Sequence, residues 1–383
     1  MRKILITAIL FSLLLQFARP TALTAATQPA SDFYGSFQVV GYYPDYWWTP
    51  IPDLRYDKLT RVIFFSIYPN IDGTLNTSEI DPNRQAELLS DAHQNNVDVS
   101  ICIGGWGLSD NFSPVAADPA TRTAFVNNLL QYCLDHGFDG IDLDWEPVST
   151  ATDRANYTAL IAELKAAMLP HDLTLSVAVF AAGSEFYSSA IDDIDYLHIM
   201  AYDMSSDPSL PHSTCEGAVQ AVKHWQSFGF PNSKIILGVP FYGRDGSWTY
   251  YSYKQIVQQY SPPPDVDEVA GIHFNGIYTI KAKTKYVMDN NLAGLMFWEL
   301  TQDTNDHISL LTAMTDQIHA SSPPDLNTDG NIGLQDLAHF ASNWLSTGCS
   351  TANAWCANAD LNQSRTVDFA DLSIFSHHWP ASD

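Results

Sequence analysis

The sequence predicts an α/β fold, a (β/α)8 TIM barrel over residues 36–320, followed by a small all-α module over residues 325–383. Short apolar runs alternate with amphipathic stretches from residue 37 to residue 320, which is the pattern of strands and helices in a parallel sheet. A polar loop then occurs twice, each time followed by a helix with an apolar face. Residues 321–324, Ser-Ser-Pro-Pro, are typical of a linker between the two parts.

Eight apolar runs are the predicted barrel strands. They are rich in β-branched and other apolar residues, as expected of strands that are buried on both faces. The runs are residues 38–43, 61–67, 97–103, 138–144, 173–179, 195–201, 234–240 and 292–298. In a barrel of eight such strands, functional side chains lie at the C-terminal strand ends.

The chain begins with the features of a secretory signal peptide, predicted over residues 1–26. Basic residues come first, an apolar stretch follows to Phe17, and small residues continue to Ala26. An uncleaved anchor is the alternative, but the apolar stretch is shorter than the roughly 20 residues that a bilayer requires. We therefore expect a secreted or cell-surface-associated protein with no membrane span after cleavage.

The charge balance limits the class of partner. The chain has 18 Lys and Arg against 43 Asp and Glu, a net charge of −25. Because like charges repel, nucleic acid and anionic membrane surfaces are improbable partners. A neutral polymer fits this charge better. The composition, 46% hydrophobic and 12% aromatic, is that of a folded chain.

Carboxylates occur at alternate positions in and just after the fourth predicted strand, within Phe-Asp-Gly-Ile-Asp-Leu-Asp-Trp-Glu at residues 138–146. Side chains on a strand alternate between faces, so Asp142, Asp144 and Glu146 project to one side, with Asp139 offset from them. Like charges in contact raise at least one carboxyl pKa toward the range of a proton donor at neutral pH. A solvated acidic edge or a metal site is the alternative.

Aromatic and charged side chains follow other predicted strands at the same rim. They are Tyr43, Tyr202, Asp203, Arg244 and Trp298, joined in nearby loops by Trp47, Trp48, Trp106 and Trp248. A sugar ring stacks its C–H faces on aromatic planes and needs hydrogen bonds for its hydroxyls, so this mixture indicates a carbohydrate cleft. Packing of the rings against the barrel is the alternative for each one.

The run at residues 138–146 resembles the catalytic signature of family 18 glycoside hydrolases, the chitinases and their relatives. The resemblance implies substrate-assisted catalysis, in which the sugar's own acetamido oxygen attacks the anomeric carbon and no cofactor is required. It implies that Glu146 is the general acid and base, that Asp144 holds the acetamido N–H, and that Asp142 shares a proton with Asp144. Asp139 would be a supporting residue.

The resemblance also extends to the rim. It implies that Tyr202 bonds the acetamido oxygen, that Asp203 is its acidic neighbour, and that Trp298 forms the floor under the sugar. Tyr43, Trp106 and Arg244 complete the expected substrate contacts.

Two departures from the family pattern stand out. Cys102 occupies a position that is usually serine, and a thiol is the weaker hydrogen-bond donor. The segment over residues 244–276 is short, so the large insertion of many processive members is absent or vestigial, and we expect a shallower groove.

In the duplicated loops at the C-terminus, oxygen-bearing residues stand at the calcium positions of an EF-hand loop. They are Asp325, Asn327, Asp329, Asn331 and Asp336 in the first copy, and Asp360, Asn362, Ser364, Thr366 and Asp371 in the second. The pair of loops resembles a type I dockerin, a calcium-folded module that docks cohesin-bearing scaffold or cell-surface proteins. A duplicated turn without metal is the alternative. Cys349 and Cys356 are close enough in sequence to form a disulfide in an oxidising compartment.

The sequence and the resemblance together predict a secreted chitinase, which cleaves β-1,4 linkages between N-acetylglucosamine units with retention and is tethered through the dockerin-like module. Two alternatives remain open. One is an endo-β-N-acetylglucosaminidase that acts on N-glycans, and the other is a lectin that binds chitin without cutting it.

Overall fold

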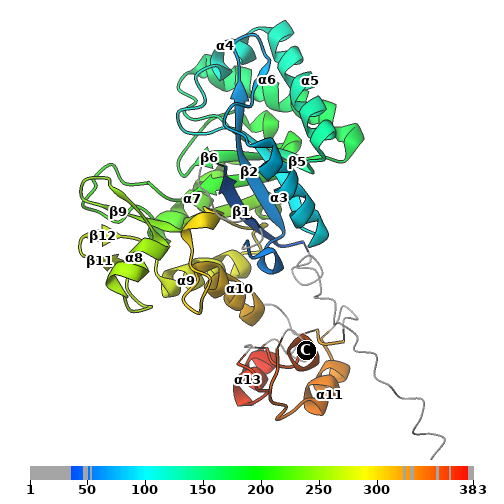
Figure 1. Cartoon of the computed structure of the whole chain (residues 1–383), viewed down its shortest axis with the longest axis vertical. Coiled ribbons are helices and arrows are strands. Elements are labelled where there is room, and N and C mark those ends of the chain that lie inside the picture. Colours follow the sequence, from blue (N-terminus) through cyan, green and yellow to red (C-terminus); the bar gives the residue numbers. More distant parts are fainter. Residues whose placement is uncertain are drawn as a thin grey trace, which may run out of the picture.

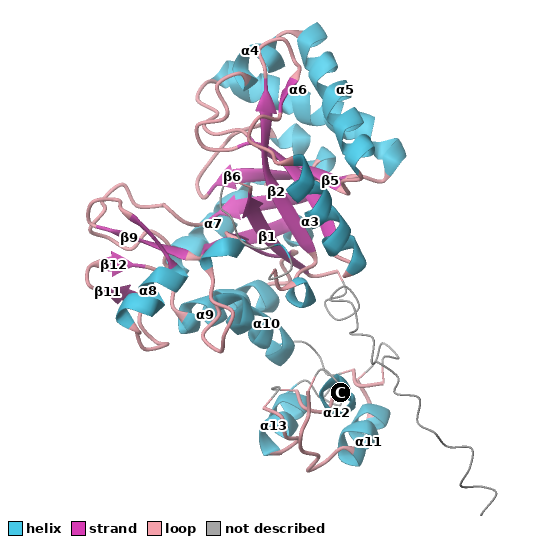
Figure 2. Ribbon diagram, viewed as in Figure 1, coloured by secondary structure: helices cyan, strands magenta, loops and turns pink. Residues whose placement is uncertain are grey.

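The computed structural model describes residues 36–45, 51, 54–321, 325–327, 332–350, 353–361 and 364–377. Its centre is a closed barrel of parallel strands, drawn in magenta in Figure 2: β1 (Gln38–Pro44), β2 (Arg61–Pro69), β4 (Asp98–Gly104), β5 (Gly140–Asp144), β6 (Thr174–Phe180), β7 (Tyr196–Met200), β8 (Ile235–Pro240) and β13 (Gly294–Trp298). β1 pairs in parallel with both β13 and β2, which closes the sheet. Each predicted run overlaps one of these strands, and the predicted TIM barrel is confirmed.

Helices surround the barrel (Figure 1): α3 (Pro82–Gln94), α4 (Phe112–Ala117), α5 (Pro119–His136), α6 (Ala151–Met168), α7 (Cys215–Phe228), α9 (Ile277–Asp289) and α10 (Leu310–Ser321). Four of these helices have an N-cap residue whose side-chain oxygen accepts a hydrogen bond from a backbone N–H of the first turn. The caps are Asp81 on α3, Asp118 on α5, Thr150 on α6 and Thr214 on α7. Between β6 and β7 the connection contains a short 3-10 helix, η4 (Ser188–Asp193), in place of an α-helix.

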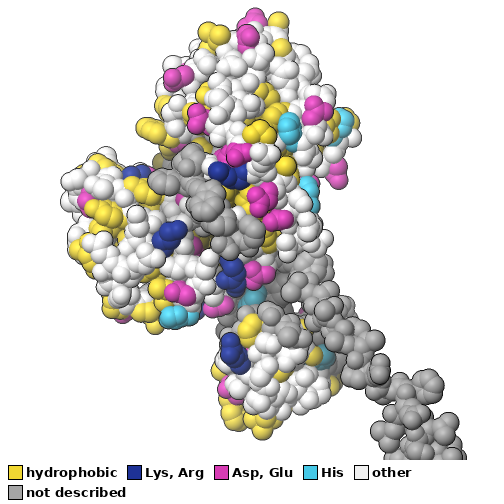
Figure 3. Space-filling view, in the orientation of Figure 1, with side chains coloured by type: hydrophobic (Ala, Val, Ile, Leu, Met, Phe, Trp, Pro, Cys, Tyr) yellow, Lys and Arg dark blue, Asp and Glu magenta, His cyan; other side chains and the backbone are white. Residues whose placement is uncertain are grey.

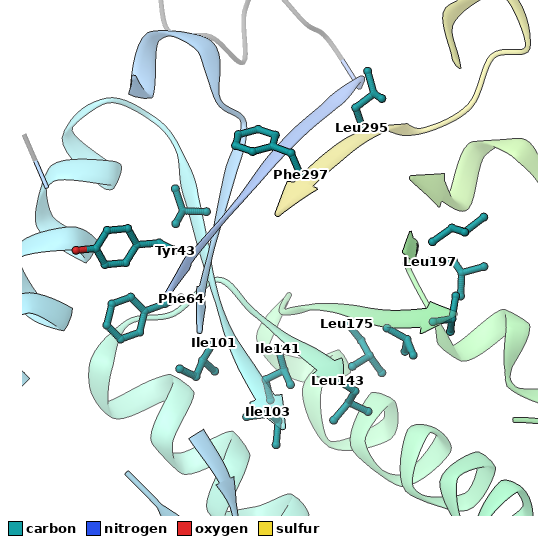
Figure 4. Close-up of a cluster of buried hydrophobic side chains, with 14 of the residues drawn as sticks. Tyr43, Phe64, Ile101, Ile103, Ile141, Leu143, Leu175, Leu197, Leu295 and Phe297 are labelled. Carbon is teal, nitrogen blue, oxygen red and sulfur yellow. The ribbon is translucent and has the colours of Figure 1, made fainter. Parts of the chain in front are cut away.

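The alternation of side chains along the strands produces two cores. Outward-facing residues such as Phe64, Ile101 and Leu143 pack under the helices, and Figure 4 shows part of this cluster. Inward-facing residues such as Ile63 and Met296 fill the barrel. Polar side chains also face the barrel interior, and they form the site described below.

The segment after β8 folds into a small antiparallel sheet of order β10-β9-β12-β11 and one helix. Its elements are β9 (Tyr242–Asp245), β10 (Tyr250–Ser252), α8 (Tyr253–Tyr260), β11 (Glu268–Val269) and β12 (Ile272–His273). A two-residue strand, β3 (Leu75–Asn76), pairs with the end of β2. The segment in which a large insertion was expected to be absent or vestigial thus forms this small sheet and one short helix.

The described residues of the C-terminal region include the helices α11 (Leu334–Ser342), α12 (Ala354–Ala357) and α13 (Phe369–His377). They enclose a hydrophobic core of their own, in which the rings of Phe340 and Phe375 stack 5.4 Å apart. Cys349 and Cys356, the pair predicted from sequence, form a disulfide within this core. The module therefore buries apolar surface independently of the barrel.

Some predictions lie outside the described residues. They are the signal peptide over residues 1–26, the loop residues Trp47 and Trp48, and the loop oxygens of Asp329, Asn331 and Asn362. Within the described part of the chain, none of the helices has the length and apolar character needed to cross a bilayer.

Candidate active site

The loops after β4 and β5 are tied together at the C-terminal end of the barrel. Gly104 and Gly105 have φ values of 98° and 100°, and the backbone N–H of Gly105 donates to the carbonyl oxygen of Asp144 (2.7 Å). A Cβ on Gly104 would lie 2.4 Å from that same oxygen, so only glycine permits the approach. Ser109 Oγ accepts the backbone N–H of Glu146 (3.0 Å). These contacts fix the position from which Glu146 projects.

Asp142 lies inside the barrel, fully buried, and its carboxylate is surrounded by donors. Tyr42 donates its hydroxyl to Oδ2 (2.7 Å) and Ser176 donates its hydroxyl to Oδ1 (2.6 Å). His198 Nδ1 lies 3.2 Å from Oδ1 and 3.0 Å from the Tyr42 hydroxyl. The expected proton sharing between Asp142 and Asp144 is therefore not the principal contact of Asp142 in this structure.

Asp144 is instead hydrogen-bonded to Glu146. Burial, followed by the charges of Glu146 and Asp142, raises the pKa of Asp144 well above its usual value. Burial raises the pKa of Glu146 to about 7, although the hydrogen bond from Asp144 opposes the shift. The pair therefore retains a proton near neutral pH, as a general acid requires. In the described part of the chain, Asp144 Oδ1 is buried and lacks a hydrogen-bond partner.

A third carboxylate near this pair was missed from the sequence. Glu185 follows β6, is 3% exposed, and accepts the backbone N–H of Phe180 at Oε1 (3.0 Å). Burial raises the pKa of Glu185 to about 6. Its negative charge in turn raises the pKa of both Asp144 and Glu146. Because it lies in a loop without a recognisable pattern, no sequence signal pointed to it.

Aromatic rings close the top of the barrel beside the carboxylates. Trp298 packs edge-on against Phe65 (centroids 4.9 Å apart) and at a tilt against Tyr42 (5.7 Å). Tyr202 is half-buried, and burial followed by the charges of Asp144 and Glu146 raises the pKa of its hydroxyl. The Tyr202 hydroxyl therefore stays protonated and can donate a hydrogen bond close to Asp144 and Glu146.

Asp203 and Arg244 form a bidentate ion pair at the rim, with Nη2–Oδ2 and Nε–Oδ1 distances of 2.6 and 2.9 Å. Tyr242 donates its hydroxyl to Asp203 Oδ2 (2.9 Å), and His212 Nδ1 lies 3.0 Å from Oδ1. Burial would raise the pKa of Asp203, but the hydrogen bonds from Arg244 and His212 hold it well below its usual value. The guanidinium also lies over the ring of Trp248.

Tyr43 is not at the site, contrary to the prediction. Its side chain faces outward, is fully buried, and stacks on Phe64 with ring centroids 6.0 Å apart, as Figure 4 shows. Tyr42, one residue earlier, faces the barrel interior and contacts Asp142. The alternation along β1 could have shown this, because Val40 and Tyr42 share one face while Val39 and Tyr43 share the other.

Trp106 and Asp139 lie at opposite ends of the barrel. Trp106, after β4, is 75% exposed at the catalytic end, where a solvent-facing indole is free to stack on a ligand. Asp139 precedes β5 at the other end, where it accepts the backbone N–H of Val99 (2.7 Å) and contacts His93 (2.8 Å). Asp139 therefore stabilises the pairing of β4 and β5 and does not contact the catalytic carboxylates.

The described parts of the two C-terminal loops contain buried carboxylates. Asp336 accepts backbone N–H groups from Leu326 and Gly333, both at 2.8 Å, and Asp371 accepts that of Asp368 (2.8 Å). Burial and the nearby charge of Asp371 raise the pKa of Asp360, against the effect of its backbone hydrogen bonds.

These oxygens are of the kind that Ca²⁺ prefers, and two neighbouring buried carboxylates favour a cation. Among the residues that the structure describes, no group of three or more Asp, Glu, His or Cys side chains is placed to hold a metal ion.

Comparison with known proteins gives the family. A family model described as glycosyl hydrolases family 18 matches residues 38–303. Chitinase 1 of Aphanocladium album is 25% identical over 337 residues, with 68% of this chain and 79% of the relative covered. A crystal structure of the chitinase ChiB from Flavobacterium johnsoniae has a TM-score of 0.67 and 28% identity, covering 73% of this chain and 93% of that one.

An Ostrinia furnacalis Group IV chitinase, solved in complex with allosamidin, has a TM-score of 0.66 and 25% identity, covering 75% of this chain and 100% of the other. The family model spans most of the barrel, including every residue of the carboxylate row. The chain belongs to the glycosyl hydrolases of family 18, and is a glycoside hydrolase.

Proposed function

We propose that the protein is a secreted chitinase, which hydrolyses β-1,4-linked N-acetylglucosamine with retention by the acetamido-assisted route. The observation that carries the proposal is the pairing of Glu146, whose pKa burial raises to about 7, with Asp144, whose Oδ1 is buried without a partner in the described chain. Burying an acceptor without a donor costs free energy, which a hydrogen bond from an N–H group of the substrate would recover. The acetamido N–H of an N-acetylglucosamine unit supplies one.

The residues then have distinct roles. Glu146 donates its proton to the glycosidic oxygen as the bond to the anomeric carbon breaks. The acetamido oxygen of the same sugar attacks that carbon and forms a cyclic oxazolinium ion, whose positive charge is stabilised by Asp144. Tyr202 donates to the acetamido oxygen and positions it. Glu146, now ionised, removes a proton from the water that opens the ring, which returns the product to the β configuration.

The remaining site residues bind the polymer. Trp298 lies at the C-terminal end of β13, where a sugar ring can stack on it, and the exposed Trp106 adds a second indole at the same end of the barrel. The Asp203–Arg244 pair presents fixed hydrogen-bonding groups beside them. Aromatic rings together with this ion pair suit a long neutral chain more than a small charged substrate.

Exchange of Glu146 for glutamine tests the assignment. Glu146→Gln keeps the size of the side chain and its ability to form hydrogen bonds, but an amide cannot transfer a proton to the leaving oxygen. Turnover of a soluble N-acetylglucosamine oligomer should therefore fall by about 10² to 10⁴. Oligomer binding should persist. Glu163→Gln, at an ion pair on α6, is the matched control and should retain wild-type turnover. Comparable turnover in Glu146→Gln and wild type would refute the role of Glu146.

We further propose that the C-terminal module binds Ca²⁺ and docks a cohesin-bearing partner. In the first loop Asp325, Asn327 and Asp336 would hold the ion together with residues beyond the described part. In the second loop Asp360, Ser364, Thr366 and Asp371 would do so. Arg365, at the sharp turn of the second loop, has a φ of 77°, a region that favours glycine, so the second site should be the weaker one.

A further inference from the structure

Asp142 lies between a cysteine and a serine in the barrel wall. The strand register places Cys102 of β4 opposite Asp142 on one side and Ser176 of β6 opposite it on the other. All three side chains face the barrel interior and are at most 1% exposed. Solvent therefore cannot replace a hydrogen bond lost from Asp142.

The two neighbours differ in what they donate. Ser176 Oγ lies 2.6 Å from Asp142 Oδ1, a short charge-assisted hydrogen bond. Cys102 also bonds Asp142, but burial and the charges of Asp142 and Asp144 raise the pKa of its thiol well above the usual value, so it remains a neutral and weak donor. The strong donor of the pair is thus on β6.

The other groups around Asp142 do not duplicate this bond. Tyr42 of β1 donates to the other oxygen, Oδ2, and its single proton cannot also bond His198. His198 of β7 shares Oδ1 at the longer distance of 3.2 Å. Asp144, on the same strand, Tyr157 of α6 and Tyr202 are further titratable groups that the charge of Asp142 affects. One layer below, Arg61 bonds Ser100 and not Asp142.

We propose that Ser176 is a positioning residue for the hydrolysis, whose hydroxyl holds the Asp142 carboxylate in place where the thiol of Cys102 cannot. This inference rests on the proposed function of the site. The negative charge of Asp142 raises the pKa of Asp144, which favours a proton on the Asp144–Glu146 pair. Without the hydroxyl, the Asp142 carboxylate is free to shift away from Asp144, this effect weakens, and Glu146 loses its acid form at a lower pH.

The register offers a test by exchange, because the hydroxyl can be moved to the other side of Asp142. Ser176→Cys keeps the side-chain size and should lower kcat about ten- to a hundredfold, since a hydrogen bond to a charged group is lost or weakened. KM should change little, and the basic limb of the kcat profile should move to lower pH. The double variant C102S/S176C returns a hydroxyl to Asp142 and should recover most of the kcat and the pH profile.

Ser100→Ala is the matched control, since it removes a buried barrel hydroxyl that faces Arg61. Its kcat should equal that of wild type in a folded enzyme, as checked by thermal melting. Ser176→Ala serves as a second variant if Ser176→Cys is poorly folded.

The outcomes separate the two claims. Wild-type hydrolysis of the N-acetylglucosamine oligomer tests the proposed function, and its absence would overturn both that function and the inference that rests on it. With an active wild type, an unchanged kcat in Ser176→Cys and Ser176→Ala would overturn the role of Ser176 alone. Failure of the folded double variant to regain activity would do the same, because it would show that packing and not the hydroxyl matters.

Discussion

At the scale of single residues, the chemistry depends on how three carboxylates share one environment. Asp144 and Glu146 hold a proton between them, while Glu185 adds a negative charge from a neighbouring loop. A negative neighbour disfavours ionisation, so Glu185 helps to keep Glu146 protonated near neutral pH. A carboxylate outside any recognisable motif thus adds to the effect of burial on the pKa of Glu146.

This arrangement predicts a pH effect for Glu185→Gln. Hydrolysis requires protonated Glu146, so the rate should fall as pH rises through its pKa of about 7. Removing the charge of Glu185 lowers that pKa, and the basic limb of the kcat profile should move to lower pH. The control Glu163→Gln should leave the limb in place. A limb unmoved by Glu185→Gln would show that Glu185 only supports its loop.

Site residues differed in how far the sequence could predict them. The carboxylate row was readable because alternate positions on one strand share a face. The alternation along β1 could have pointed to Tyr42 in place of Tyr43, because Tyr42 shares the inward face with Val40. Ser176 and His198 could not be found in this way, since their contact with Asp142 depends on the register between strands.

At the scale of elements, the loop that carries Tyr202 is held by a buried lysine. Lys283 of α9 donates to the carbonyl oxygen (3.0 Å) and hydroxyl (2.8 Å) of Ser213, and to Asn275 Oδ1 (2.7 Å). Ser213 in turn donates to the carbonyl oxygen of Ala201, next to Tyr202 (2.6 Å). Burial lowers the pKa of Lys283 to about 7. A single side chain thus connects a helix to the loop after β7.

Replacing this lysine should destabilise the barrel. Lys283→Met fits the buried space but leaves the acceptors of Ser213 and Asn275 without their donor, which costs about 2 kcal/mol. Lys285→Met on the same helix removes only an exposed ion pair with Asp289 and should cost about 0.5 kcal/mol or less. Denaturant unfolding measures both. Equal losses from the two variants would contradict the role of Lys283 as a buried connector.

Elements were predicted more completely than sites, and for a physical reason. Each barrel strand is buried on both faces, so its apolar run is continuous and visible in the sequence. The small sheet of β9 to β12 is short and partly exposed, and its runs carry no such pattern. Its existence depends on pairing between segments that are individually weak.

At the scale of the whole molecule, the barrel and the C-terminal module have separate hydrophobic cores. The barrel cores and the core around Phe340 and Phe375 have no residue in common. The net charge is −25, and the face drawn in Figure 3 shows Lys and Arg side chains scattered without a continuous basic patch. This surface agrees with a neutral polymer as the substrate.

Because the barrel and the C-terminal module have separate hydrophobic cores, we predict that they respond separately to calcium removal. Chelation should lower the melting temperature of the C-terminal module, because carboxylates such as Asp336, Asp360 and Asp371 lose the ion they would share. The barrel transition and the turnover of a soluble oligomer should remain unchanged. Calorimetry with and without chelator, together with a Ca²⁺ titration, measures this. Two sites of equal affinity would contradict the proposed weakness of the second loop, and an unaffected module would argue against a calcium site.

The most direct measurement of the central claim is proton NMR of the products, recorded within minutes of mixing the full chain with an N-acetylglucosamine oligomer. Acetamido-assisted hydrolysis through Glu146 and Asp144 predicts that the new reducing end appears first as the β-anomer and then converts slowly to the equilibrium mixture. The α-anomer as first product would contradict the route. An oligomer that stays intact would contradict the chitinase assignment, and would favour an enzyme of N-glycans or, if it binds, a lectin.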